Sequence, residues 1–234
     1  MNTAVDDIRD ATLAGPAKSL HLGRPQLRAR DREVFFHRLV PMPLLLASTS
    51  ASRRSMLADA GIEFEARAPE CDEDAVKRGH DGDLESLVGK LAALKASSLA
   101  ADPGDWVIGS DSAVEVEGVR YSKPRDRDQA AEHLKAFSGR TMMLASAVAL
   151  ARDGAVDWCH AETARLDVCA LSDSFIATYL DAEWPAVSYC VGVFRIEARG
   201  VHLFERIEGS HFTVLGMPLL PLLGALRERG AIAA

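Results

Sequence analysis

The sequence is poor in aromatic residues, in closely spaced cysteines and in long uninterrupted apolar runs. Only 6% of its 234 residues are aromatic, although 48% are hydrophobic. The four cysteines include no C-x-x-C pair and the histidines show no metal-ligand spacing, so a zinc site or a disulfide framework is not expected. No apolar run is long enough to span a bilayer, and the N-terminus lacks the apolar core of a secretory signal. We therefore expect a cytoplasmic protein with no membrane partner.

An excess of positive charge is also missing. The formal net charge is −7, which disfavours binding along a nucleic-acid backbone, so we expect no nucleic-acid partner. A locally basic pocket could still hold a small anion.

Residues 1–41 differ from the rest of the chain. They hold seven Lys and Arg against five Asp and Glu and show no steady periodicity. We predict that they form a mobile extension, either dispensable or the product of an upstream start site. Met42 opens the apolar stretch that follows, and residues 42–234 are predicted to form a single globular domain.

Apolar patterning in that domain predicts strands mixed with helices. Strands are expected at 44–47, 62–69, 106–111, 141–150 and 161–171. Helices are expected at 53–60, 84–101, 126–139 and 172–184, with a last one that ends near Gly230. A hairpin is predicted around Glu117-Gly118. The mixture favours an α/β domain with helices on both sides of the sheet.

The stretch "LASTSASRRSML", residues 46–57, joins the first strand to the first helix. The first turn of a helix has unpaired backbone N–H groups, and hydroxyl donors precede it here at Ser48, Ser50 and Ser52. With Arg53 and Arg54 these donors could form a site for a phosphate-sized anion. The alternative is an ordinary loop with solvated arginines.

Carboxylates occur in two candidate places. "ECDEDA", residues 70–75, is either a solvated acidic loop or a source of oxygen ligands for Mg²⁺ or Mn²⁺. Asp111 follows the apolar run "WVIGS", so it is expected at or just past a strand end. There it could bind a metal or polarise water, or it could only form an Asx-turn.

Two lysines are ambiguous in the same way. Lys123 precedes Pro124, which favours an extended backbone from which the ammonium could reach a phosphate. Lys95 lies at the edge of an apolar helical stripe, so it could extend to solvent or turn into a pocket.

Taken together, these segments resemble the Maf family of nucleoside triphosphate pyrophosphatases. The matching segments, in family order over about residues 43–229, are "LLLASTSASRRSML", "APECDED", "LAALKA", "VIGSDSAV", "SKPRD", "LKAFSGRT" and "GVFRIEARGVHLFERIEGSHFTVLGMPLLPLL". The resemblance implies a mixed β-sheet flanked by helices, with two lobes around a cleft, similar to inosine triphosphatase-like folds. It implies hydrolysis of a nucleoside triphosphate to a monophosphate and pyrophosphate, with a divalent metal, Mg²⁺ or Mn²⁺.

The resemblance also implies roles for individual residues. The residues expected to hold the triphosphate are Ser48, Ser50, Arg53 and Arg54. The residues expected to act in catalysis are Asp111, Glu73, Lys123 and Lys95, with Asp111 as proton acceptor for the attacking water. Glu73 and Asp111 are also the expected metal ligands.

Base preference in the family depends on positions that correspond here to Ser52, Ser112 and Glu197. The dTTP/UTP branch typically has Arg, Thr and Gln, and the 7-methyl-GTP branch has Trp, Gln and Glu. Only Glu197 matches either set, so the chain resembles the 7-methyl-GTP branch more than the other. A carboxylate there could accept hydrogen bonds from a guanine. A dTTP/UTP preference stays open.

A second interpretation stays open beside the enzyme. The family has a reported link to septum formation, so the chain could be a nucleotide-binding regulator of cell division with little turnover. We also leave homodimerisation open.

Overall fold

The computed structural model describes residues 43–233, which belong to one compact unit, Pro41–Ala234. The predicted extension, residues 1–41, lies outside the described residues. Its mobility, its dispensability and the domain boundary stay predictions.

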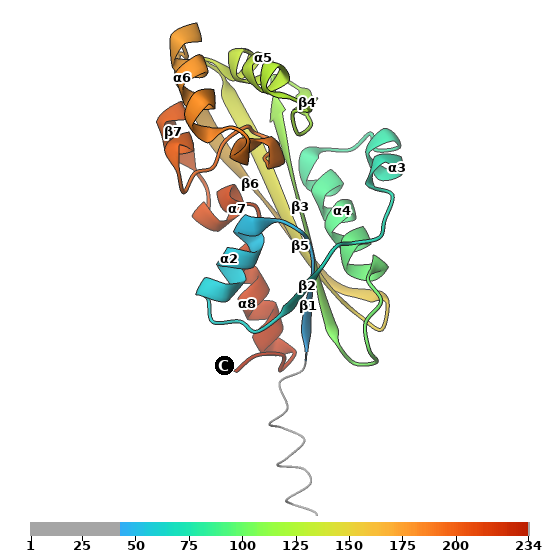
Figure 1. The fold of residues 1–234 in the computed structure, drawn as a ribbon. Helices are drawn as coiled ribbons and strands as arrows, with labels where there is room; N and C mark the ends of the chain where they lie inside the picture. The colour runs from blue at the N-terminus through green and yellow to red at the C-terminus, as the bar shows by residue number, and fades with distance from the viewer. Residues whose placement is uncertain (1–42, 234) are drawn as a thin grey trace, which may run out of the picture. The chain divides into compact units, whose positions relative to one another are not determined.

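A seven-stranded mixed sheet forms the centre of the fold, in the order β2-β1-β3-β5-β6-β7 with β4 paired to β3 (Figure 1). The strands are β1 Leu44–Ala47, β2 Glu65–Arg67, β3 Trp106–Val116, β4 Val119–Tyr121, β5 Thr141–Arg152, β6 Ala155–Val168 and β7 Phe204–Glu208. β1 is parallel to β2 and β3, and every other pairing is antiparallel. This arrangement confirms the predicted mixed α/β fold.

Helices cover the sheet and connect its strands. They are α2 Ala51–Asp59, α3 Glu73–Arg78, α4 Leu84–Ser98, α5 Arg127–Phe137, α6 Asp173–Glu183, α7 His211–Leu215 and α8 Leu219–Glu228, with 3-10 turns η1 Ala186–Tyr189 and η2 Arg199–Leu203. Side-chain caps start several of them: Ser50, Asp83, Asp126 and Ser172 each accept a hydrogen bond from a backbone N–H in the first helical turn. The predicted hairpin is confirmed, with Glu117 and Gly118 at φ values of 51° and 78° between β3 and β4.

Some predicted boundaries were wrong. The alternating segment 62–69 forms a strand only at Glu65–Arg67. β6 begins at Ala155 rather than at residue 161, because its pairing with β5 extends back to that residue, where the strand is largely exposed. β3 does not end at Asp111 but continues to Val116, since antiparallel pairing with β5 extends over its whole length.

One face of the long strands alternates between apolar and polar zones. On β3, Trp106 and Ile108 belong to one buried cluster and Val114 belongs to another. Ser110 and Ser112 lie between them on the same face, because alternate residues of a strand share a face. The two clusters agree with the two predicted lobes, and the cleft between them stays a prediction.

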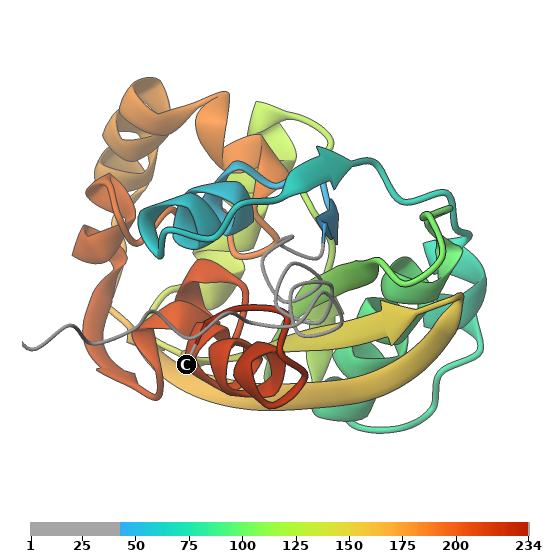
Figure 2. The same ribbon diagram turned by 90° about the horizontal axis from the view of Figure 1, so that it is seen from below.

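The opposite face of the sheet packs against α4. It consists of small residues, including Ala145, Ala147 and Ala149 of β5, which lie against Val88 and Ala92 of the helix. Figures 1 and 2 show α4 on this side of the strands and α2 and α8 on the other. At Gly109 the approach is closest, since a Cβ there would lie 2.2 Å from the carbonyl oxygen of Ala92. The sequence thereby brings the helix backbone directly against the strand.

Candidate active site

The candidate site lies at a gap along one edge of β3. On this edge β1 pairs with β3 only as far as Gly109, and β4 pairs with it only from Val114 onward. Within the described residues, the segment 110–113 therefore has no strand beside it on this edge. Backbone and side-chain groups of residues 110–113 can therefore form hydrogen bonds with side chains from neighbouring elements.

The loop after β1 fills part of this gap. Ser48 is buried, and its hydroxyl accepts hydrogen bonds from the Ser50 backbone N–H at 3.2 Å and from Arg53 Nη1 at 3.5 Å. The Ser50 hydroxyl caps α2 and lies 3.0 Å from the hydroxyl of Ser52. The predicted order of strand, tight loop and helix is confirmed, although the helix starts at Ala51, two residues earlier than expected.

Arg53 reaches into the gap and binds protein groups. Its guanidinium donates to the carbonyl oxygens of Ser110 and Gly216, each at 2.9 Å, and to the Ser112 hydroxyl at 3.0 Å. Burial lowers the pKa of Arg53, while the negative charges of Asp111 and Glu73 act in the opposite direction. Arginine nevertheless keeps its proton in proteins, so a fixed positive charge stands at the gap.

Lys95 joins the two predicted carboxylates on the α4 side of the sheet. Its Nζ lies 2.6 Å from Asp111 Oδ1 and 3.0 Å from Glu73 Oε1. Lys95 and Asp111 are both buried. Of the two alternatives left open by the sequence, the helix turns this lysine toward the carboxylates and not out to solvent.

Glu73 lies at the start of α3, where Asp72 is the N-cap. Partial burial acts to raise its pKa, but the attraction of Lys95 and Lys77 outweighs burial, and the pKa lies below the usual glutamate value. Glu73 is thus held in its anionic form beside the ammonium of Lys95.

Lys123 lies in the loop that follows β4, with its side chain exposed overall. Partial removal of its ammonium from water lowers its pKa, and the positive charges of Arg53 and Lys95 lower it further. Asp111 and Glu73 oppose this shift. Asp111 and Glu73 thus act on the pKa of Lys123 as they do on that of Arg53. We call this set of mutually influencing groups, Arg53, Glu73, Lys95, Asp111 and Lys123, the electrostatic neighbourhood.

The remaining predicted residues differ in exposure and contacts. Arg54 is exposed on α2, and Ser52 is half-buried at the start of the same helix. The Ser112 hydroxyl also bonds Ser146 Oγ at 2.8 Å and the Gly216 carbonyl oxygen at 3.0 Å. Glu197 is exposed in the chain between η1 and η2.

Sequence reasoning missed a buried polar network behind Arg53. Ser110 and Ser146, both fully buried, donate to the carbonyl oxygens of Ala147 and Thr213, each at 2.8 Å. The only signal in the sequence was the presence of serines inside these apolar strands, Ser110 and Ser112 in β3 and Ser146 in β5. Because unpaired buried hydroxyls are costly, such serines indicate a network that joins neighbouring elements.

The donor set fits a divalent cation together with a polyphosphate. Two carboxylates, Asp111 and Glu73, point to one place, and Mg²⁺ in proteins typically binds one or two carboxylates plus substrate phosphates. No group of three or more His, Cys, Asp or Glu side chains within residues 43–233 is placed to hold a metal by itself. The positive side chains outnumber these two carboxylates, which suits an anionic substrate.

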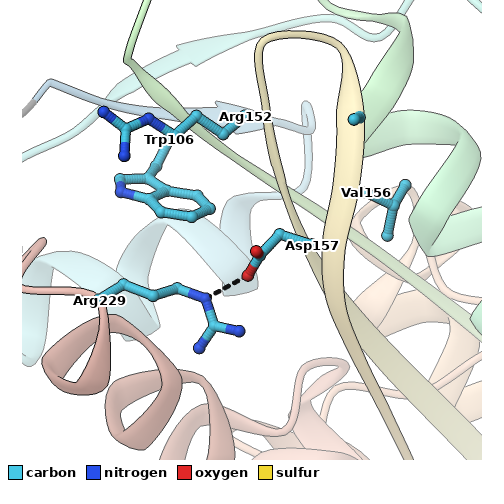
Figure 3. A pocket seen from close by; sticks show the side chains of 6 residues that line it. Trp106, Arg152, Val156, Asp157 and Arg229 are labelled. Atoms are coloured by element: carbon cyan, nitrogen blue, oxygen red, sulfur yellow. Dashed lines mark hydrogen bonds and ion pairs between the residues drawn. The ribbon is translucent and has the colours of Figure 1, made fainter.

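A cavity lies away from these residues. It measures about 400 Å³ and is lined by Trp106, Arg152, Asp157 and Arg229 at the opposite end of β3, where the guanidinium groups of Arg152 and Arg229 stack over the Trp106 ring (Figure 3). A smaller one is lined by Phe175, Tyr179 and His202. Neither includes a predicted site residue. The candidate site is defined instead by the charged side chains that meet at the gap, Arg53, Lys95, Asp111 and Glu73.

Comparison with known proteins gives concordant matches. A family profile described as "Maf-like protein" matches residues 43–229. A nucleoside triphosphate pyrophosphatase of Nitrobacter hamburgensis is 44% identical over 196 residues, covering 82% of this chain and 96% of the relative. A 7-methyl-GTP pyrophosphatase of Rhizobium meliloti is 45% identical over 195 residues, covering 82% of this chain and 98% of the relative.

Among solved structures, the Staphylococcus aureus Ham1 protein is 15% identical with a TM-score of 0.43, covering 80% of this chain and 98% of that one. In the part of the chain that the structure describes, no helix combines the length and the apolar character needed to cross a bilayer.

Proposed function

The chain belongs to the Maf family, and from this premise we propose that it hydrolyses nucleoside triphosphates to a nucleoside monophosphate and pyrophosphate. The observation that carries the proposal is the position of Lys95 Nζ, 2.6 Å from Asp111 and 3.0 Å from Glu73, with Arg53 and Lys123 in the same electrostatic neighbourhood. A surface that only binds nucleotides has no need of two carboxylates, Asp111 and Glu73, beside the negatively charged triphosphate.

In this proposal cationic groups bind the triphosphate. Lys123 and Arg54 have exposed side chains that can reach phosphate oxygens, and the first turn of α2 adds unpaired backbone N–H groups. Arg53 contributes its fixed charge while its contacts to Ser110 and Gly216 hold the gap in shape. Phosphoryl-type transfer is catalysed mainly by such positioning and charge neutralisation.

Asp111 accepts the proton of the attacking water. The water oxygen forms a new bond to phosphorus, the bond between the α- and β-phosphates breaks, and pyrophosphate leaves with the electron pair of that bond. Lys95 Nζ donates to Asp111 Oδ1 at 2.6 Å and so orients this carboxylate. The Asp111 carboxylate, held by Lys95, is therefore positioned to take the proton of the attacking water.

Glu73 and Asp111 would hold the divalent cation, Mg²⁺ or Mn²⁺. When bound, it neutralises charge that builds up on the phosphates. Lys95 holds the two carboxylates together by contacting both.

Among nucleotides, we propose a preference for a guanine base such as that of 7-methyl-GTP. Glu197 is a hydrogen-bond acceptor of the kind that guanine N1–H and N2 amine groups require. One of the relatives described above carries the name 7-methyl-GTP pyrophosphatase. Ser52 offers no aromatic face for stacking on a methylated base, so dTTP and UTP belong in the same screen.

The test is a screen of triphosphates, scored for pyrophosphate, with Asp111→Asn as the inactive variant. We expect pyrophosphate from 7-methyl-GTP or GTP, loss of activity with EDTA, recovery with Mg²⁺ or Mn²⁺, and a fall of at least about 100-fold in Asp111→Asn. Release of orthophosphate would contradict the proposal, because it indicates cleavage at the γ-phosphate. Tight nucleotide binding with no product would favour the regulator of cell division instead.

We also propose homodimerisation and a cytoplasmic location. Homodimerisation is testable by sedimentation of the full chain, and a cytoplasmic location by fractionation.

A further inference from the structure

The segment 190–198, which we call the base loop, joins η1 to η2 and contains Glu197. Its backbone is strained at Val193, whose φ of 55° is unusual for a β-branched residue. The Val193 carbonyl oxygen accepts a 3.0 Å hydrogen bond from the hydroxyl of buried Tyr179 on α6. Such strain persists only where surrounding contacts hold the backbone in place. The base loop is therefore a rigid segment and not a loose connection.

A buried carboxylate fixes the middle of the base loop. Glu183, the last residue of α6, is 5% exposed, and its Oε2 accepts from Arg195 Nη2 at 2.8 Å and from Arg195 Nε at 3.2 Å. The Arg195 carbonyl oxygen in turn accepts from the Ala198 N–H at 3.1 Å. Gly200 packs so tightly on this backbone that a Cβ would lie 2.5 Å from the Arg195 oxygen. Arg195 thus sets the position of the chain on both sides of Glu197.

Val193 and Phe194 of the base loop belong to the same buried apolar cluster as Val114, the first residue of β3 beyond the gap. The Cys190 thiol at the start of the base loop is influenced by charges from both sides: burial and Glu197 raise its pKa to about 11, while Arg195 and Lys123 act to lower it. Lys123 is also influenced by Arg53 and Asp111 of the site. Glu197 therefore lies on a segment that packs in the cluster next to the β3 end of the gap.

The burial of Glu183 calls for a reason other than stability. A buried ion pair contributes little net stability compared with an apolar pair of similar size, because desolvation offsets the attraction. Two hydrogen bonds from one guanidinium to one carboxylate do restrict the geometry of the pair. Here that geometry is the path of the base loop.

We propose that Glu183 is a positioning residue: through Arg195 it holds the base loop so that Glu197 can accept hydrogen bonds from the base of the bound nucleotide. The proposal rests on the proposed function and extends it. Glu197 then recognises the base, and the buried Glu183 on α6 holds Glu197 in position through Arg195. A base with N–H donors, as in guanine nucleotides, is favoured.

The test uses Glu183→Gln, which preserves the side-chain shape and removes the charge. Asp181→Asn is the matched control, because Asp181 lies on the same helix, is 73% exposed and pairs with Arg127 rather than with the base loop. For each full-length variant we would measure kcat and KM for 7-methyl-GTP, GTP and UTP, and the binding of a non-hydrolysable α,β-methylene GTP.

We expect Glu183→Gln to raise KM for the preferred guanine nucleotide about tenfold, with kcat changed by no more than about twofold and UTP little affected. Binding of the analogue should weaken by a similar factor. Asp181→Asn should behave like the unaltered chain. An equal loss of kcat for every nucleotide, an unchanged ranking of nucleotides, or the same effect in the control would overturn the proposal.

Arg195 provides an independent pair of variants if Glu183→Gln does not fold. Arg195→Lys retains the ion pair and should retain most of the base preference, whereas Arg195→Gln should lose it. If both variants keep the preference, the proposal is wrong. If the unaltered chain releases no pyrophosphate, the proposed function fails, and binding of the analogue decides the positioning role alone: unchanged affinity in Glu183→Gln, or no binding to the unaltered chain, overturns it.

Discussion

At the scale of single residues, Arg53 and Arg54 show how adjacent identical side chains acquire different tasks. The sequence predicted one anion-binding pair, with both arginines on the phosphate. In the structure Arg53 joins Ser110, Ser112 and Gly216, whereas Arg54 is exposed. Helical geometry places consecutive side chains about 100° apart, so only one of them can point into the sheet.

This difference can be tested with paired substitutions. Arg53→Lys keeps the charge but cannot reach acceptors in several directions, so we expect the free energy of unfolding to fall by about 2 kcal/mol. Arg54→Lys should change it by less than about 0.5 kcal/mol, because the residue is exposed. Urea denaturation of both variants measures this. Equal losses in the two variants would mean that the contacts of Arg53 contribute nothing specific.

Lys95 illustrates what single-residue reasoning could not settle. A lysine beside an apolar helical stripe can extend into solvent or turn into a pocket. The local sequence of Lys95 did not decide between these two orientations. The structure places it against Asp111 and Glu73, from β3 and α3, which are distant in the chain. Its ionic partners follow from packing, since no local spacing relates them.

At the scale of elements, the contact between α4 and β3 brings Lys95 to Asp111. The stripe of small residues on β5 and the absence of a side chain at Gly109 allow the helix backbone to approach the strand. The strand VIGSD was predicted from its apolar run, but the need for glycine at its centre becomes evident only with α4 in place. The same contact sets the distance from Lys95 to Asp111.

We therefore expect Gly109→Ala to disrupt the site from a distance. The added Cβ would lie 2.2 Å from the Ala92 oxygen, so helix and strand must separate, at a cost of about 3 kcal/mol. The rate of pyrophosphate release should also fall in Gly109→Ala. Gly89→Ala, on the outer part of α4, is the control: its Cβ would lie no nearer than 3.8 Å to a neighbour, and it should stabilise the helix by about 0.5–1 kcal/mol. Thermal melts would reveal the opposite signs, and a neutral Gly109→Ala would contradict the close approach.

At the scale of the whole molecule, the long strands β3, β5 and β6 connect two apolar clusters with a polar band between them. The candidate site lies where β1 ends and β4 has not yet begun, beside this band. Its residues come from the first helix, the α3–α4 region, the central strand and the loop after β4. The site therefore requires the whole sheet, and not any one segment.

The boundary of the domain gives a prediction at this scale. A chain that begins at Met42 should fold with a melting temperature within about 2 °C of the full chain, since a change of 1 kcal/mol shifts the midpoint of a domain of this size by about 2–4 °C. Its pyrophosphate release should be unchanged. A much larger loss of stability would show that residues 1–41 belong to the folded unit.

The sequence by itself determined the class of fold and the chemical character of the site. Apolar periodicity and capping residues such as Asp126 and Ser172 depend on interactions within a few residues, so they can be read along the chain. Tertiary structure alone decided that β3 continues through Asp111, that Arg53 holds the gap in the sheet, and that Glu183 pairs with Arg195. These features arise from strand pairing and from the burial of charges between distant segments, and the free energy of such contacts depends on neighbours that local sequence does not specify.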